Sequence, residues 1–182
     1  MIQKNERRRY ASDLSDSQWA IIQPLLPPAG NKSKWEKREL IDAVLYFVDN
    51  GCKWRNLPHD FPPYTTVANF YYAAIRSGLW EKIRAALVER VRTNTGRNAD
   101  PSYAIIDSQS VKNHRCRRRT GNRRGKKTKG RKRHIVVDTM GNLLSVVVHA
   151  ANIHDTKAGI LVARDAFKKY PSIQRFGISQ NI

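Results

Sequence analysis

One aspartate, Asp107, directly follows the apolar run Ala104-Ile105-Ile106. At the carboxyl end of a strand, its carboxylate would be held rigidly where a hydrated cation could meet it. Mg²⁺ takes one or two carboxylates plus phosphate oxygens, and paired metal ions assist phosphoryl transfer. An aspartate in this place is also a common turn or cap residue. Asp107 is therefore a candidate metal ligand and catalytic residue that needs support from other features.

A basic run over residues 115–133 holds 12 basic and no acidic residues. The whole chain has 34 Lys+Arg against 15 Asp+Glu, a net charge of +19, so a polyanion partner is expected. A solvated segment without a partner is the alternative. Such a run would contact phosphates without reading sequence. The predicted phosphate contacts are Arg117, Arg118, Arg119, Lys126, Lys127, Lys129, Arg131, Lys132 and Arg133.

Sequence-specific contacts are expected from a helix predicted from residue 65 or 66 to Gly78. Its predicted inward-facing residues are Val67, Phe70 and either Ala74 or Ile75. Its predicted outward-facing residues, and the candidates for contacts to DNA bases, are Asn69, Tyr72 and Arg76. The Pro-rich segment 51–64 before it is much longer than the turn of a helix-turn-helix motif. A plain helical core is the alternative reading of the aromatic residues here.

Other acidic and histidine residues are expected to be structural. Asp138 in a strand pair and Asp155 at a helix start are predicted to make a hairpin contact and an N-cap. His149, His154 and Asp155 have the composition of a two-His-one-carboxylate metal site, but neighbours in sequence need not converge in space. We therefore assign none of them a catalytic role.

Four helices must position the residues before about residue 100. The apolar spacing predicts them at about 15–26, 37–49, 65–78 and 80–93. Ser15 and Gln18 have capping-box spacing. The second helix is expected to pack through Leu40, Val44, Phe47 and Val48, and the fourth through Ile83, Leu87 and Val91.

The pattern changes after Pro101 to that of strands, predicted at 103–107, 134–139 and 143–150. Gly141-Asn142 is a turn signal between the last two. Both faces of these strands carry Ile, Leu or Val, which predicts a sheet covered on two sides. A helix beginning at Asp155 or Thr156 and ending before Pro171 follows.

Several classes of protein are disfavoured by composition. No stretch approaches the roughly 20 apolar residues of a spanning helix, and the start has no apolar run typical of a secretory signal. Cytoplasmic residence and no membrane partner are expected. Cys52 and Cys116 lack CxxC spacing, so free thiols are predicted.

Four blocks of the sequence, in this order, resemble insertion-sequence transposases of the IS-five family. They are LSDSQWAIIQPLLPP, GCKWRNLPHDFPPYTTV, AIIDSQSVK and KGRKRHIVVDTMGNLLSVVVHAANIHD. The resemblance implies a DDE catalytic domain of RNase H-like fold, with aspartates on the first and fourth strands and a glutamate on a later helix binding two Mg²⁺ ions. The first aspartate corresponds to Asp107. The second should follow a stretch resembling residues 172–176, where this chain reads Gly177-Ile178-Ser179.

The fold class expected on these grounds is α+β, with an all-α domain followed by an incomplete RNase H-like α/β domain of three strands and one helix. The expected parts are a basic N-terminal arm at 1–13, a helical DNA-binding domain at 14–98 and a truncated catalytic domain at 99–182 with a basic loop at 112–133. A frameshift or premature stop near residue 177 would explain the truncation.

The expected function is that of a DNA transposase, cleaving and joining DNA at element ends by Mg²⁺-dependent phosphoryl transfer in intact relatives, with this chain inactive alone. The partners would be the terminal inverted repeats and a homo-oligomer or a hetero-oligomer with full-length transposase. The alternatives are a non-catalytic DNA-binding regulator, an aggregation-prone remnant and a basic RNA-binding protein.

Overall fold

The computed structural model describes residues 7, 9–28, 34–112, 130–150 and 153–179. The chain divides into two compact units, Met1–Leu87 and Val88–Ile182. The division falls within one helix, α4 (Leu79–Asn94), which contributes its first turns to unit 1 and its last turns to unit 2. Each unit has its own core and is described separately.

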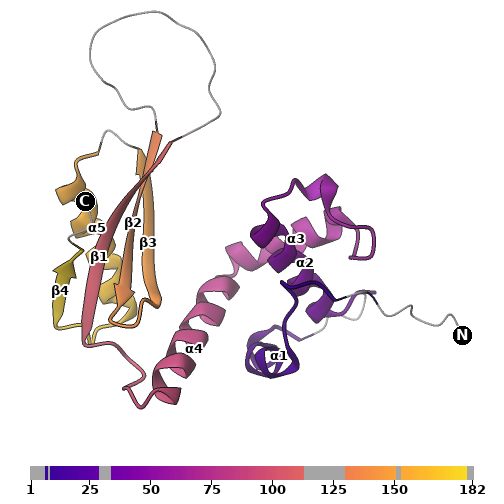
Figure 1. Cartoon of the computed structure of the whole chain (residues 1–182), viewed down its shortest axis with the longest axis horizontal. Helices are drawn as coiled ribbons and strands as arrows, with labels where there is room; N and C mark the ends of the chain where they lie inside the picture. The colour runs from indigo at the N-terminus through magenta and orange to yellow at the C-terminus, as the bar shows by residue number, and fades with distance from the viewer. Residues whose placement is uncertain (1–6, 8, 29–33, 113–129, 151–152, 180–182) are drawn as a thin grey trace, which may run out of the picture. The chain divides into compact units, whose positions relative to one another are not determined.

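Unit 1 is entirely helical in its described residues. Besides the start of α4, its elements are α1 (Asp16–Ile22), η1 (Gln23–Leu25), α2 (Lys37–Asn50), η2 (Trp54–Asn56) and α3 (Tyr64–Arg76) (Figure 1). The capping box predicted at the start of α1 is present, since Ser15 and Gln18 bond to each other's backbone. Gly51 ends α2 in the left-handed conformation, with a φ of 58°. All four predicted helices are therefore confirmed.

The core of unit 1 consists of two apolar clusters, which share the partly buried side chains of Phe70 and Trp80. Ile41 belongs to one cluster, and Val44 and Val67 to the other. Val67 and Ala74 face inward as predicted, whereas Ile75 is exposed. These two clusters hold α2 and α3 together.

One predicted inward residue of α2 is wrong: Val48 is 62% exposed. The last turn of α2 packs instead through Phe47, whose ring stacks on Trp54 of η2 with a centroid distance of 3.6 Å. Because η2 meets the helix on that side, Val48 lies beyond the contact.

Unit 2 is a four-stranded sheet with the order β3-β2-β1-β4, packed against one long helix, α5 (Figure 1). The elements are β1 (Tyr103–Lys112), β2 (Gly130–Asp138), β3 (Leu143–Ala150), α5 (Asp155–Lys169) and β4 (Arg175–Ile178). β1 pairs antiparallel with β2 and parallel with β4, and β2 pairs antiparallel with β3. Gly141 closes the β2–β3 turn with a φ of 80°. The mixed α and β composition agrees with the predicted α+β class.

The prediction of three strands was wrong, because Arg175–Ile178 forms a fourth. This strand is too short to show a period in sequence, and it forms by pairing with β1. The two central strands are also longer than predicted. Their ladder continues to the pair Lys112↔Gly130, so part of the predicted basic loop at 112–133 is strand.

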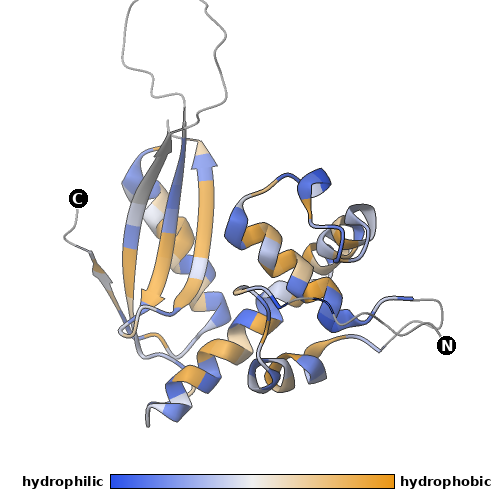
Figure 2. Cartoon of the chain, turned by 45° about the vertical axis from the view of Figure 1, so that its right-hand side comes forward, coloured by the Kyte–Doolittle hydropathy of each residue, from blue (hydrophilic) through white to orange (hydrophobic). Residues whose placement is uncertain are grey.

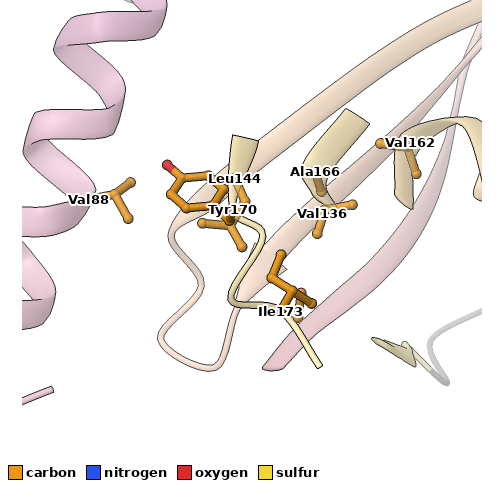
Figure 3. Close-up of a cluster of buried hydrophobic side chains, with 8 residues drawn as sticks. Val88, Val136, Leu144, Val162, Ala166, Tyr170 and Ile173 are labelled. Carbon is orange, nitrogen blue, oxygen red and sulfur yellow. The ribbon is translucent and has the colours of Figure 1, made fainter. Parts of the chain in front are cut away.

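The core of unit 2 lies between the sheet and α5, with Val136 beside Val162 and Ala166 (Figure 3). Val88 of α4 joins the same cluster. The prediction that Val91 faces inward was wrong, since Val91 is 42% exposed. α4 supplies Ile83 to one core and Val88 to the other, so its buried stripe shifts near the division between the units.

The prediction of a sheet covered on both faces was also wrong for the described residues of unit 2. α5 covers one face, while Val146 and Val148, on the other face, are 40% and 55% exposed. Figure 2 shows apolar residues along the strands as well as on the helix that covers them. Cys52 is a free thiol, and Cys116 lies outside the described residues. No helix in the described ranges has the length and apolar character needed to cross a membrane.

Candidate functional site

Asp107 lies in the middle of β1 and not at the strand end that the sequence predicted, because the ladder with β2 continues for five more residues. It pairs with Ile135 of β2. On its other side, β4 runs parallel, with Ile178 beside Ile106, and the backbone N–H of Ser179 donates to the Ile106 carbonyl over 3.0 Å. The end of β4 is therefore the part of the chain next to Asp107.

Alternation along β1 decides which face carries this carboxylate. Ala104 and Ile106 pack in the core against α5, so Asp107, between Ile106 and Ser108, points to the face that α5 does not cover. The side chain is half-buried. No group of three or more His, Cys, Asp or Glu residues within the described ranges is arranged to hold a metal ion. The described residues therefore do not give Asp107 the further carboxylate or histidine ligands of a metal centre.

On the α5 face, two histidines from neighbouring strands form a hydrogen-bonded pair. Nε2 of His149 lies 2.9 Å from Nδ1 of His134, and Nδ1 of His149 lies 2.9 Å from the Ala150 carbonyl. A carbonyl only accepts, so Nδ1 of His149 carries a hydrogen, and in the neutral pair Nδ1 of His134 donates to His149. Nε2 of His134 is then a buried acceptor with no hydrogen-bond partner. Burial and the nearby His149 lower the pKa of His134.

The carboxylate of Asp155 lies close to this pair but is bound to a lysine. Its Oδ1 atom is 2.9 Å from Nζ of Lys132 and 3.7 Å from Nε2 of His134. Asp155 is the first residue of α5 rather than the predicted N-cap, which is His154. The two histidines brought together are therefore His134 and His149, and His154 caps the helix instead of joining them.

An open pocket of about 420 Å³ lies between α5 and the sheet. Its lining is mainly apolar, and the polar side chains in it include those of His134, Asp155 and Ser108. Asp107 does not line it. The pocket and the candidate catalytic carboxylate are therefore on different faces of the sheet.

The hairpin contact predicted for Asp138 is part of a larger network. Asp138 accepts hydrogen bonds from the backbone N–H groups of Met140 and Asn142, from the Asn142 side chain, and from Nη1 of Arg92 at 2.7 Å. Arg92 also donates to the carbonyls of Asn98, Ala99 and Asp100. Burial alone would raise the pKa of Asp138, but the bonds from Asn142 and Arg92 outweigh it and the pKa is lowered. Sequence reasoning missed Arg92, because a basic residue in an amphipathic helix looks like any solvated side chain.

In unit 1, the three polar residues predicted to face outward on α3, Asn69, Tyr72 and Arg76, are all exposed. Tyr72 is 49% exposed, and the edge of its ring meets the ring of Tyr71. Each side chain is one helical turn from the next. They form a row on α3 that an elongated partner could follow.

Three of the predicted phosphate contacts are described. Arg131, Lys132 and Arg133 lie in β2, and Arg131 and Arg133 are exposed, whereas Lys132 is bound to Asp155. The others lie outside the described residues: Arg117, Arg118, Arg119, Lys126, Lys127 and Lys129.

Comparison with known proteins gives two family matches, one for each part of the chain. Residues 14–84 match the family "Putative transposase of IS4/5 family (DUF4096)", and residues 98–173 match the "Transposase DDE domain". No solved structure matches the chain.

The chain is similar to two curated relatives over most of the length of each relative. The protein y4sN of Sinorhizobium fredii is 32% identical over 105 residues, which are 56% of this chain and 77% of the relative. A 16.2 kDa protein of the insertion element IS402 of Burkholderia cepacia is 27% identical over 112 residues, which are 54% of this chain and 72% of the relative. With its two transposase matches in the order that the sequence blocks predicted, the chain belongs to the insertion-sequence transposases of the IS4/5 type.

Proposed function

We propose that this transposase binds the ends of its element through α3 of unit 1, and that Asp107 of unit 2 is one ligand of a Mg²⁺ site that the described residues do not complete. A transposase of this family acts on DNA, and DDE transposase domains in general use divalent metal ions. The observation that carries the proposal is that the end of β4 carries no carboxylate where it meets β1: Ile178 pairs with Ile106, and Ser179, just after the strand, donates to the Ile106 carbonyl.

The order of the sheet supports an RNase H-like interpretation of unit 2. The resemblance expects aspartates on the first and fourth strands of that fold, and here β1 and β4 are parallel neighbours. Two carboxylates on adjacent parallel strands could share a pair of metal ions. The resemblance expects the second aspartate just after a stretch resembling residues 172–176, where this chain reads Gly177-Ile178-Ser179.

The residues present do not fit a two-metal centre. Ile135 of β2 pairs with Asp107, and Ser179, which follows β4, bonds to the preceding residue Ile106. Neither side chain is a carboxylate of the kind Mg²⁺ prefers. Among the described residues, no group of three or more His, Cys, Asp or Glu side chains could share a cation with Asp107. We therefore derive no cleavage step for this chain, and we propose that it is inactive alone.

The DNA-binding role of α3 rests on its exposed row of polar side chains. Asn69 and Arg76 can form bidentate hydrogen bonds to base edges in the major groove, and Tyr72 lies between them on the helix. The Arg131 and Arg133 side chains of unit 2 would add contacts that position the phosphate backbone.

A second candidate function is that of a non-catalytic regulator, which occupies element ends or enters oligomers of full-length transposase. The lack of a carboxylate at Gly177, Ile178 and Ser179 favours this function as well, since the chain could then bind DNA without cleaving it. The two possibilities differ in whether a polypeptide supplying the missing carboxylates restores cleavage in the presence of this chain.

The test is a Mg²⁺-dependent cleavage and strand-transfer assay on duplex DNA from the element end, with binding measured in parallel across a salt series. We expect salt-dependent binding and no cleavage, for the chain and for Asp107→Ala alike. Cleavage that Asp107→Ala abolishes would refute the incomplete site. Substitution of Asn69, Tyr72 and Arg76 should reduce the preference for element over random duplex, and unchanged preference would refute the role of α3.

A further inference from the structure

The segment between α2 and α3 is anchored against both helices by one aromatic residue. Trp54, the first residue of η2, stacks on Phe47 of α2, and its ring centroid lies 5.4 Å from that of Tyr71 and 6.4 Å from that of Tyr72, both in α3. Leu57, just after η2, is 6% exposed and belongs to the core. η2 is therefore held beside the exposed Tyr72 of the α3 row.

The residues on either side of this anchor are basic and face outward. Lys53 and Arg55 are both exposed, as the inward side chain between them requires. Neither makes an ion pair among the described residues. Both cations are therefore available to an anionic partner that approaches α3.

The surrounding segment has a net positive charge. Between residues 50 and 80, Asp60 is the one acidic residue. Its two carboxylate oxygens are 3.0 Å from the Tyr10 hydroxyl. Asp49, which precedes the segment, is not within ion-pair distance of Lys53 or Arg55 in the described chain. Lys53, Arg55 and Arg76 thus give the segment that holds η2 and α3 a net positive charge.

We propose that Lys53 and Arg55 bind phosphates of the duplex whose bases α3 contacts, so that η2 sets the register of α3 on the DNA. The inference rests on the proposed function of α3 and adds to it a second element with a different task. The Trp54 contacts hold the backbone of Lys53, the N-cap of η2, and of Arg55 beside α3. Ammonium and guanidinium groups are the usual donors to phosphate oxygens. Base contacts would select the sequence, and the η2 contacts would fix the position.

The expected effect follows from counterion release. Each phosphate contact contributes about 0.9 to the slope of log K against log salt, which corresponds to about eightfold in affinity near 0.1 M salt. Lys53→Gln and Arg55→Gln should each lower the slope by about 0.9 and weaken element and random duplexes by the same factor. The double variant should lose roughly 60-fold near 0.1 M salt, if the contacts are independent.

The matched control is Lys34→Gln. Lys34 is exposed like Lys53, but it precedes α2 whereas η2 follows it. A helix of 14 residues separates the two by about 20 Å. This variant should keep the slope, and Lys53→Arg should keep it too, because the charge is retained. Far-UV circular dichroism and Trp fluorescence of every variant check that the fold is intact.

Binding of both duplexes would be measured by fluorescence anisotropy between 50 and 300 mM salt. An unchanged slope in Lys53→Gln and Arg55→Gln, or a loss confined to the element duplex, would overturn the inference. If these variants lower the slope while the α3 substitutions leave sequence preference unchanged, the phosphate contacts stand and the role of α3 fails. If only the α3 substitutions have an effect, the inference fails and the proposed function stands.

Discussion

Removing the Asp138 carboxylate should destabilise unit 2 more than any other single change at an ion pair. The Asp138 side chain is 0% exposed and that of its partner Arg92 is 7% exposed, with 2.7 Å between the charged atoms. In Asp138→Ala, the guanidinium of Arg92 remains buried without its carboxylate. Breaking one side of a buried pair costs about 3–5 kcal/mol, because the other charge is left uncompensated.

The structure indicates the lower end of that range. Arg92 keeps its hydrogen bonds to the backbone carbonyls of Asn98, Ala99 and Asp100, so its charge retains part of its polar environment. The N–H groups of Met140 and Asn142, which also lose an acceptor, are near the turn, where water can replace it. We therefore expect a loss of about 3 kcal/mol. With a urea slope of about 1.5 kcal/mol/M, the unfolding midpoint should fall by about 2 M.

The measurement is a urea titration followed by two probes. All Trp residues of the chain lie in unit 1, at positions 19, 35, 54 and 80, so Trp fluorescence reports that unit while far-UV circular dichroism reports both. The control is Asp155→Ala, which breaks the Lys132 pair, with 2.9 Å between the charged atoms and a carboxylate side chain that is 55% exposed. An exposed pair contributes about 0–1 kcal/mol. Equal shifts in Asp138→Ala and Asp155→Ala would refute the reasoning that burial sets the cost.

Three further outcomes follow from the same structure. The pKa of Asp138 is lowered despite its burial, because the hydrogen bonds from Asn142 and Arg92 outweigh the desolvation. The contribution of Asp138 to stability is therefore full above about pH 4 and is lost as the pH falls through the folded pKa. In Asp138→Asn, urea midpoints should depend less on pH in this acidic range. Burial and the nearby His149 lower the pKa of His134 in the folded chain. As the pH drops below about 6.5, the unfolded chain therefore protonates this histidine more readily, and the stability of the folded chain should fall. The urea midpoint of His134→Gln should not show this fall. Gly51 has a φ of 58°, so Gly51→Ala should lower the free energy of unfolding by about 1 kcal/mol. Urea unfolding followed by Trp fluorescence measures this change. An unchanged midpoint would mean that the end of α2 relaxes freely.

The sequence predicted correctly those features that depend only on residues within one helix or turn. The capping box at Ser15, the spacing of Val67 and Ala74 on α3, and the turn at Gly141 all depend on residues a few positions apart, and each is confirmed. The wrong predictions concern side chains whose burial depends on packing against another element. Val48 and Val91 fit the helical period but lie on sides of their helices where no core meets them.

Strand bounds could not be predicted where the pairing partner lies far away in sequence. β4 has four residues, and its partner Tyr103–Ile106 precedes it by about 70 residues. The basic residues that lengthen β2 look like a loop by composition, yet they continue the ladder with β1. Asp107 was found as a strand residue after an apolar run, but its place in the middle of β1 depends on that ladder.

The same dependence on distant partners explains the limits of predicting the site. The spacing of residues in the sequence was enough to single out Asp107 and to compare His149, His154 and Asp155 as neighbours. It could not pair His134 with His149, which are 15 residues apart, or Arg92 with Asp138, which are 46 residues apart. The parallel pairing of β1 and β4 has the larger consequence for function. It places Gly177 and Ile178 beside Ile105 and Ile106, just before Asp107 on β1. Whether Asp107 could share a metal ion, as we propose, therefore depends on the side chains at the end of β4.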